Sequence, residues 1–189
     1  HMIYGPTAAR ILAQFGAEVI KVEVPHQGDY WRSSTYWGKY WKHSNPMWHF
    51  INHSKYFTAI DVKVPLGKKL ILQLAQKSDV VIENFSPGTV DAWGIGYRAV
   101  SKANPGVIYA SLSTFGQYGS MRFSPGWDLL AQGASGMLAA TGHEGTDKYY
   151  KVPDFYGDFY PGNFAAMMIM MALHHRRRSE KGQYLDLAQ

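Results

Sequence analysis

The stretch KVPDFYGDFYPGNFAAMMIMMALHHRRRSEKGQYLDLAQ, residues 151–189, decides the fold. Apolar residues run almost unbroken from Asn163 to Leu173, which predicts a buried helix with Asn163 as its N-cap. Basic residues follow where a helix dipole favours cations, and Gly182 is expected to end the helix. The alternation over residues 184–187 then predicts a strand, so the stretch reads as one half of an α/β unit.

Asp158 is expected on a loop just before this helix. A loop held by a rigid scaffold is a common mounting for a catalytic carboxylate. An Asp at this place is more often a helix cap or a solvated loop acid than a nucleophile. The residues by themselves leave both interpretations open.

Working outward, helical and strand patterns alternate along most of the chain, which predicts a doubly wound, mostly parallel α/β sheet. A strand before Gly5 would complete the first unit, and we expect one there. The helix at 65–77 is expected to turn Leu66, Leu70, Ile71 and Leu74 inward. Helices are predicted over 5–15, 65–77, 89–93, 97–103 and 126–142, and strands over 17–23, 55–62, 79–84 and 107–112.

Two features of this pattern indicate where a ligand or another segment could lie close to the backbone. Ligands of such sheets bind at the carboxyl ends of the strands, here residues 83–85 and 113–116. The helix at 126–142 contains Gly133 and Gly136, and because glycine costs about 1 kcal/mol in a helix, close packing is expected there.

Residues 25–53 are rich in Trp and Tyr and show little regular periodicity. We interpret them as a long loop segment, and such segments are usually functional or poorly ordered. The rings from Trp31 to Trp48 could pack on each other or on a partner subunit, or could stack on a ligand.

Composition limits the classes of protein. The chain has 189 residues, 46% of them hydrophobic and 17% charged, which suits one soluble globular domain. No apolar run reaches the roughly 18 residues of a membrane span, so no membrane association is expected. The absence of cysteine excludes a disulfide framework and thiolate metal ligands, and the cytoplasm is the expected location.

A formal charge of +5 indicates an anionic partner. Arg176 to Arg178 form the one basic cluster, and no nucleic-acid-binding motif accompanies it, so a polyanionic small molecule is favoured over nucleic acid. The eight histidines show no HExxH spacing, and the neighbours His174 and His175 cannot share one helix face. No metal site is expected.

Seven segments, in order along nearly the whole chain, resemble the class III coenzyme A transferases, which include formyl-CoA:oxalate and carnitine CoA-transferases. They are GPTAARILAQFGAEVIKVE (5–23), the PxxGD-type turn (25–29), VVIENFSPGTVDAWGIGY (80–97), NPGVIYASLSTFGQYGS (104–120), PGWDLLAQGASGMLAATG (125–142), GDFYPG (157–162) and KGQYLDL (181–187).

The resemblance implies a Rossmann-like large domain in a homodimer whose two chains interlock. Residues 1–189 would form part of that CoA-binding domain, with the first strand and the C-terminal half of the family absent. We therefore assign the implied function to the parent enzyme, and we expect the 189-residue piece alone to have little or no activity.

Asp158, in GDFYPG, matches the catalytic aspartate of the family. The resemblance implies transfer of coenzyme A from an acyl-CoA to a small carboxylic acid through aspartyl anhydride and aspartyl-CoA intermediates. A carboxylate attacks without losing a proton, so this nucleophilic catalysis needs no histidine base. Acyl-CoA is then a substrate, and no metal takes part.

By motif position, the family's CoA-binding residues correspond to Arg32, Lys55, Lys63, Asn84 and Phe85. The cations suit phosphates and Phe85 could stack on adenine, although each lysine is equally explained as a solvated surface charge. Asp128 and Gln117 fall near the implied site as accessory residues. Ala92 stands where several members have an arginine, so one phosphate contact is expected to be missing.

Two other functions compete. The related α-methylacyl-CoA racemases need a histidine and an aspartate, and their GHD motif reads Gly126-Trp127-Asp128 here. Because tryptophan cannot act as a general base, the transferase is favoured. The aromatic segment and the short length also fit a non-catalytic binding or assembly fragment.

Overall fold

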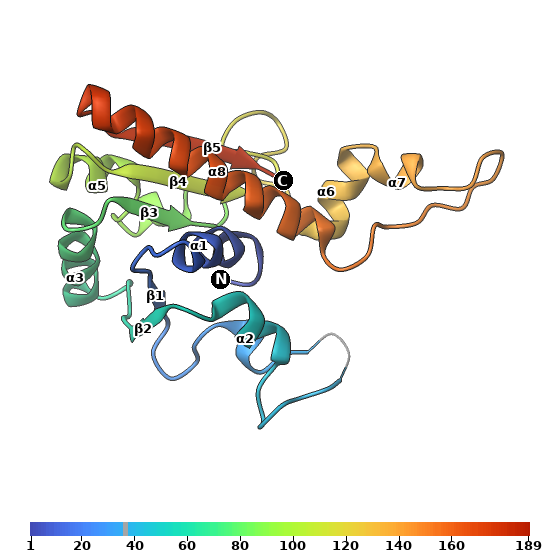
Figure 1. Ribbon diagram of the computed structural model, residues 1–189, viewed down its shortest axis with the longest axis horizontal. Helices are drawn as coiled ribbons and strands as arrows, with labels where there is room; N and C mark the ends of the chain where they lie inside the picture. The colour runs from blue at the N-terminus through green and yellow to red at the C-terminus, as the bar shows by residue number, and fades with distance from the viewer. Residues whose placement is uncertain (36–37) are drawn as a thin grey trace.

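The computed structural model describes residues 1–35 and 38–189, and parallel strands form its centre (Figure 1). The strands are β1 (Ile20–Glu23), β2 (Tyr56–Ala59), β3 (Val80–Glu83), β4 (Ile108–Ser113) and β5 (Gln183–Ala188). The α-helices are α1 (Tyr4–Gln14), α2 (Pro46–Asn52), α3 (Pro65–Gln76), α4 (Thr89–Ala92), α5 (Tyr97–Ala103), α6 (Asp128–Ala134), α7 (Met137–Ala140) and α8 (Tyr156–Ser179).

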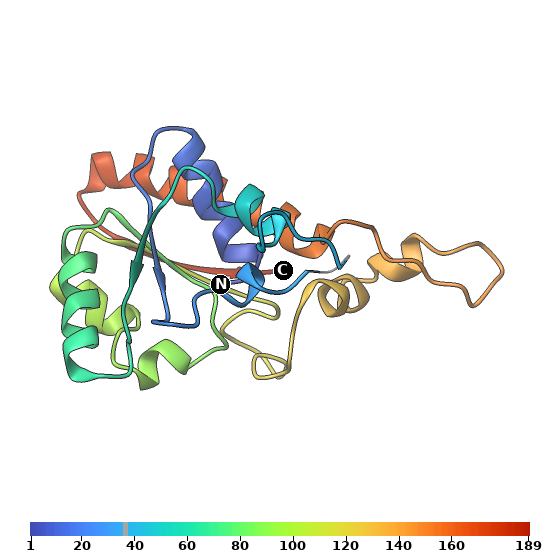
Figure 2. The same ribbon diagram turned by 90° about the horizontal axis from the view of Figure 1, so that it is seen from below.

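The three-stranded sheet has the order β3-β4-β5, with β4 in the middle. Successive residues of β4 point to opposite faces, so Ala110 and Leu112 pack on α1 and α8, whereas Tyr109 packs towards α3 and α5. Figure 2 shows α1 and α8 on one side of the sheet and α3 and α5 on the other. The predicted α/β class, with parallel strands covered on both faces, is confirmed.

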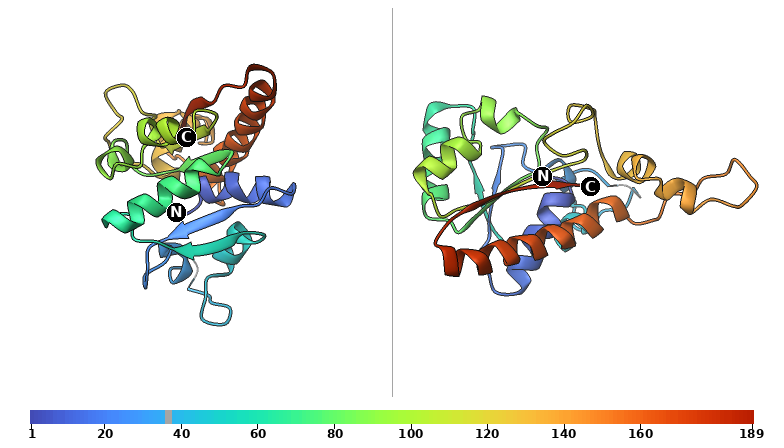
Figure 3. Two further views of the ribbon diagram at one scale, coloured as in Figure 1. Left: turned by 90° about the vertical axis from the view of Figure 1, so that its left-hand side faces the viewer. Right: turned by 90° about the horizontal axis from the view of Figure 1, so that it is seen from above.

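The strands β1 and β2 pair in parallel with each other and form a separate two-stranded sheet. Among the described residues the parallel strands thus fall into two sheets, whereas the sequence pattern did not separate them. The N-terminus lies between the two sheets (Figure 3). A further strand before Gly5 stays a prediction.

The long helix α8 begins at Tyr156, so the prediction of an N-cap at Asn163 is wrong and Asp158 lies in the first helical turn rather than on a loop. The cap comes from a distant residue, because the Asp128 carboxylate accepts a hydrogen bond from the Gly157 N–H. The helix ends at Ser179 instead of reaching Gly182. Gly182 is needed for another reason, since a Cβ there would lie 2.3 Å from the Val107 carbonyl oxygen.

The aromatic segment contains regular structure that its composition did not predict. It folds into a 3-10 turn, Tyr30–Arg32, and the helix α2, which Asn45 caps by accepting a hydrogen bond from the Met47 N–H at 2.9 Å. Trp31 and Trp48 are buried in one cluster with Ile3 and Ile51. These two rings pack inside the protein, while the predictions for Tyr36 and Trp37 fall outside the described residues.

The predicted helix at 126–142 is broken into α6 and α7, which project from the body with the loop that follows them (Figures 1 and 2). Gly136 adopts a φ of +80° and nothing lies within 4 Å of its would-be Cβ. The expected close packing is therefore wrong for Gly136, because the glycine serves a left-handed turn.

On α3, the expectation that Leu66 and Leu70 face inward is wrong, since they are 65% and 40% exposed. Gly67 is buried instead, and a Cβ there would lie 1.7 Å from the Asp61 carbonyl oxygen. The helix thus approaches the end of β2 through its backbone, which turns these leucines outward.

Candidate active site around Asp158

The start of α8 is fixed by the buried carboxylate of Asp128. Its Oδ1 accepts hydrogen bonds from the Gly157 N–H at 2.6 Å and from Gln132 Nε2 at 2.8 Å. A Cβ on Gly157 would lie 2.8 Å from the Asp128 carbonyl oxygen, so only glycine fits there without movement. Asp128, predicted as an accessory residue, therefore holds the turn that carries Asp158.

The Asp158 carboxylate is half-buried and has one oxygen engaged. Oδ1 accepts a hydrogen bond from Gln189 Nε2 at 2.6 Å, whereas Oδ2 accepts none from the residues that the structure describes. This leaves one oxygen able to attack a substrate, mounted on the first turn of a long helix.

The pKa of Asp158 is raised to about 7, mainly by burial and secondly by the nearby charge of Asp128, while the hydrogen bond from Gln189 acts in the opposite direction. A carboxyl with this pKa is about half ionised at neutral pH. Poor solvation of the ionised form also leaves its lone pairs available for nucleophilic attack. The electrostatics fit a reactive carboxylate rather than a solvated loop acid.

Three predicted site residues follow the ends of β3 and β4. Asn84 exchanges hydrogen bonds with His1, accepting at Oδ1 from its amine at 2.7 Å and donating from Nδ2 to its carbonyl at 2.9 Å. The Phe85 ring lies edge-on to Trp93, with 4.9 Å between centroids. The Gln117 backbone N–H donates to the Asp186 carboxylate, and its buried Nε2 has no hydrogen-bond partner in the described part of the chain.

The three predicted cations come from three different segments of the chain, and each has its own surroundings. Arg32 Nε donates to Glu23 at 2.6 Å, and its guanidinium lies 3.8 Å from the Trp48 ring centroid. Lys63 is exposed ahead of α3.

Lys55 is buried, and its Nζ donates to Pro6 O, Ile51 O and Asn52 Oδ1 at 2.8 to 3.0 Å. Burial lowers the pKa of Lys55 to about 7, with Lys21 and Arg10 adding repulsion. All three of its N–H donors are used inside the protein.

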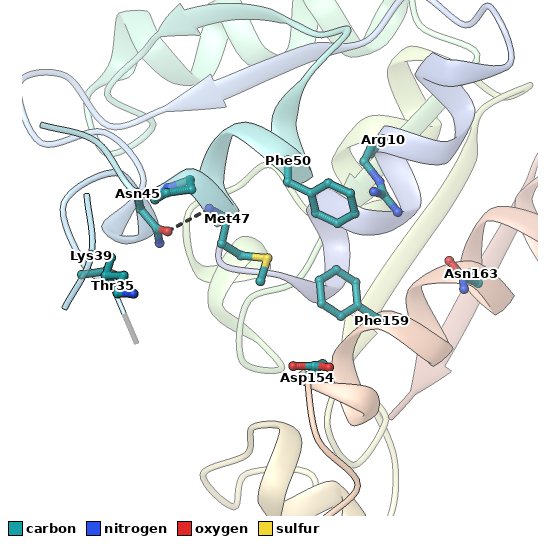
Figure 4. Close-up of a pocket in the computed structure, with 10 residues that line it drawn as sticks. Arg10, Thr35, Lys39, Asn45, Met47, Phe50, Asp154, Phe159 and Asn163 are labelled. Atoms are coloured by element: carbon teal, nitrogen blue, oxygen red, sulfur yellow. Dashed lines mark hydrogen bonds between the residues drawn. The ribbon is translucent and has the colours of Figure 1, made fainter. Parts of the chain in front are cut away.

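A cleft of about 980 Å³ opens between α1, α2 and the start of α8 (Figure 4). Phe159, the residue after Asp158, lines it together with Phe50, Met47 and Arg10. Sequence reasoning missed this cleft because an arginine on an amphipathic helix looks like any solvated cation. It also missed Gln189, although its place at the end of a parallel strand was a usable signal.

Among the described residues, no group of three His, Asp or Glu side chains could hold a metal ion. None of the helices that the structure describes is long and apolar enough to cross a membrane.

The sequence model of CoA-transferase family III matches residues 1–189. The chain belongs to CoA-transferase family III. Among curated members, the chain is 37% identical to succinyl-CoA–D-citramalate CoA-transferase of Chloroflexus aurantiacus, over 97% of this chain and 45% of that protein. It is 34% identical to acetyl-CoA:oxalate CoA-transferase of Acetobacter aceti, over 100% of this chain and 48% of that protein.

A solved structure supports the same family assignment. A CaiB/BaiF family protein from Brucella suis superposes with a TM-score of 0.91 and 31% identity, covering 100% of this chain and 50% of that one. The chain thus spans about half the length of the curated family III relatives that it matches.

Proposed function

We propose that the full-length protein transfers coenzyme A from an acyl-CoA to a carboxylic acid, with Asp158 as the nucleophile. One observation carries the proposal: Asp158 presents an oxygen without a hydrogen bond among the described residues, from a carboxyl whose burial raises its pKa to about 7. Family membership supports the reaction class, because its curated relatives are CoA-transferases.

In the proposed reaction, Asp158 attacks the thioester carbonyl carbon, the C–S bond breaks, and coenzyme A leaves as a thiolate. The products of this step are an aspartyl acyl anhydride and the thiolate. The thiolate then attacks the aspartyl carbonyl and releases the donor acid as a carboxylate, which leaves coenzyme A on Asp158. The acceptor carboxylate attacks this thioester and forms a second anhydride. The released thiolate attacks the acceptor acyl carbon of that anhydride, which yields the new acyl-CoA and restores Asp158 without any net proton transfer.

For coenzyme A, the strand-end residues Asn84 and Phe85 remain our proposed contacts, together with Arg32 and Lys63. Lys55 fits this role less well, because its ammonium already donates to three protein oxygens. A phosphate would have to replace at least one of these buried bonds.

For the acceptor we propose a dicarboxylic acid. Both curated relatives described above are named for dicarboxylic acceptors, D-citramalate and oxalate. The cleft beside Phe159 is large enough for such an acid and adjoins the helix that carries Asp158.

The homodimer also remains a proposal. The outer side of α8 carries apolar side chains that are about half exposed: Phe164 at 45%, Met167 at 47% and Met171 at 58%. Their spacing places them along one stripe of the helix. A second copy of the full-length chain covering this stripe would remove it from water.

Trapping of covalent intermediates tests the reaction. Incubating the full-length protein with succinyl-CoA and then hydroxylamine should leave a hydroxamate on Asp158, detected by peptide mass spectrometry. Because only the ionised carboxylate attacks, the rate of trapping should rise with pH through about 7.

Two outcomes would contradict this function. Incorporation of deuterium at the α-carbon of a branched acyl-CoA, with no adduct and no acyl exchange, would indicate a racemase. Binding of acyl-CoA with neither reaction would indicate a non-catalytic role.

A further inference from the structure

Arg10 is a cation in the wall of the cleft without a matching anion. Its Nε is buried and has no hydrogen-bond partner among the described residues, and no ion pair joins Arg10 to a carboxylate there. Its guanidinium lies 4.4 Å from the centroid of the Phe50 ring. Burial lowers the pKa of Arg10, so the charged form is poorly solvated as it stands. Burying a guanidinium N–H without a partner costs free energy that a bound anion would recover.

The other groups around the cleft define what such an anion would look like. Phe50, Met47 and Phe159 supply apolar surface, as Figure 4 shows. Lys39 adds a second cation and Asp154 a single acid. Short methylene chains suit the apolar walls, and a planar carboxylate matches the two parallel N–H donors of a guanidinium.

We propose that Arg10 binds the second carboxylate of a dicarboxylic substrate whose other end reaches Asp158. The inference rests on the proposed transferase function and adds to it the residue that distinguishes a diacid from a monoacid. Phe159 directly follows Asp158 and lines the cleft together with Asn163, so the cleft runs along the start of the helix that carries Asp158.

The test uses Arg10→Met, which removes the charge and keeps an apolar chain against Phe50, in the full-length protein. With glutarate as acceptor, kcat/KM should fall about 100-fold, mostly through KM, because a charge-assisted bidentate contact is lost. With valerate, a monocarboxylic acid of equal carbon number, kcat/KM should change less than about threefold. Arg10→Lys should recover part of the glutarate activity.

Arg98→Met, on the exposed face of α5, is the matched control for loss of one positive charge and should behave as the wild type with both acids. An equal loss with glutarate and valerate, or no loss with glutarate, would overturn the role of Arg10. If the wild type transfers coenzyme A to neither acid, the transferase proposal has failed instead. In that case calorimetry with glutarate tests the role of Arg10 by itself. Glutarate must bind more weakly to Arg10→Met than to the wild type if Arg10 binds its carboxylate.

An independent observation concerns Gln189. Its Nε2 donates to Asp158 Oδ1 at 2.6 Å, its Oε1 accepts from Thr114 Oγ1 at 2.6 Å, and its backbone N–H donates to Ser113 O at 3.0 Å. The Thr114 hydroxyl therefore fixes which end of the amide faces Asp158. Gly126 makes room for this threonine, since a Cβ there would lie 2.2 Å from Thr114 Oγ1.

We infer that Gln189 is a positioning residue, which holds Oδ1 so that Oδ2 faces the substrate and which favours the ionised carboxylate. This inference also rests on Asp158 being the nucleophile. In Gln189→Leu the pKa of Asp158 should rise, because a hydrogen bond to the ionised form is removed. Thr114→Val should act in the same direction with a smaller effect.

The measurement is the pH profile of kcat in the full-length protein. The acid limb of Gln189→Leu should move to higher pH, with kcat at pH 7 lower by about tenfold and KM little changed. Gln183→Leu, at the start of the same strand, is the control and should leave the profile unchanged. A loss of kcat with an unmoved acid limb would reduce Gln189 to a structural role, and an unchanged kcat would overturn the inference. Titration of the Asp158 carboxyl by ¹³C NMR measures the same pKa shift without turnover, and so separates this inference from the transferase proposal.

Discussion

Asp158→Asn in the full-length protein is expected to lower kcat/KM for CoA transfer by about 10,000-fold or more, because an amide cannot form the anhydride. The substitution keeps the shape of the side chain and an oxygen that can accept from Gln189 Nε2. Binding of acyl-CoA should therefore persist while transfer and hydroxylamine trapping disappear. Steady-state kinetics and peptide mass spectrometry measure these effects.

The same variant should be more stable than the wild type at alkaline pH. The pKa of Asp158 is raised from 3.8 to about 7 in the folded protein, so the folded state binds more protons than the unfolded state between these values. Stability therefore falls as pH rises through this window, and ionised Asp158 destabilises the fold by about 1–2 kcal/mol after allowance for solvent screening. Asp158→Asn removes this penalty above pH 7 and changes little below pH 4.

Denaturant unfolding at pH 8 and at pH 3.5 distinguishes this result from general damage. Asp147→Asn, on the exposed loop after α7, is the control and should change neither stability nor activity. Retention of transfer in Asp158→Asn would exclude Asp158 as the nucleophile. If Asp158→Asn and the wild type have the same free energy of unfolding at both pH values, the Asp158 carboxylate is well solvated in the folded protein.

Hydrophobic periodicity predicted two kinds of element: those that pack against segments close in sequence, and those whose faces are all buried to the same degree. The strands β3 and β4 appear as short apolar runs, because both of their faces are covered, and α1 and α5 lie within about a residue of their predicted bounds. The sequence put Asp158 on a loop before a helix that begins at Asn163, which is wrong, because α8 begins at Tyr156 and already includes Asp158.

What the sequence could not supply depends on contacts between distant residues. The start of α8 is fixed by Asp128, which lies 29 positions earlier in the chain. The amphipathic pattern of α3 did not reveal that Gly67, and not Leu66, would meet the end of β2. Gln189 reaches Asp158 only because β5 lies beside β4 and ends near the start of α8, which no local pattern encodes.

Asp128→Ala is the second substitution with a large expected effect. It removes the acceptor of the Gly157 N–H and of Gln132 Nε2, and leaving these buried donors unpaired should destabilise the protein by about 2–4 kcal/mol. Because the first turn of α8 would no longer be held, the Asp158 carboxylate should lose its alignment, and transfer should fall by about 100-fold. Denaturant unfolding and steady-state kinetics of the full-length protein measure the two effects.

Asp128→Asn separates the role of Asp128 as a hydrogen-bond acceptor from the effect of its negative charge on Asp158. The amide oxygen can still accept from the Gly157 N–H, so stability should be largely kept, but the negative charge that raises the pKa of Asp158 is gone. The acid limb of the activity profile should therefore move below pH 7, opposite to its shift in Gln189→Leu. An unmoved acid limb would mean that Asp158 does not sense the charge of Asp128. Wild-type stability in Asp128→Ala would show that α8 begins at Tyr156 without the hydrogen bonds to Asp128, so that another contact would have to hold the turn that carries Asp158.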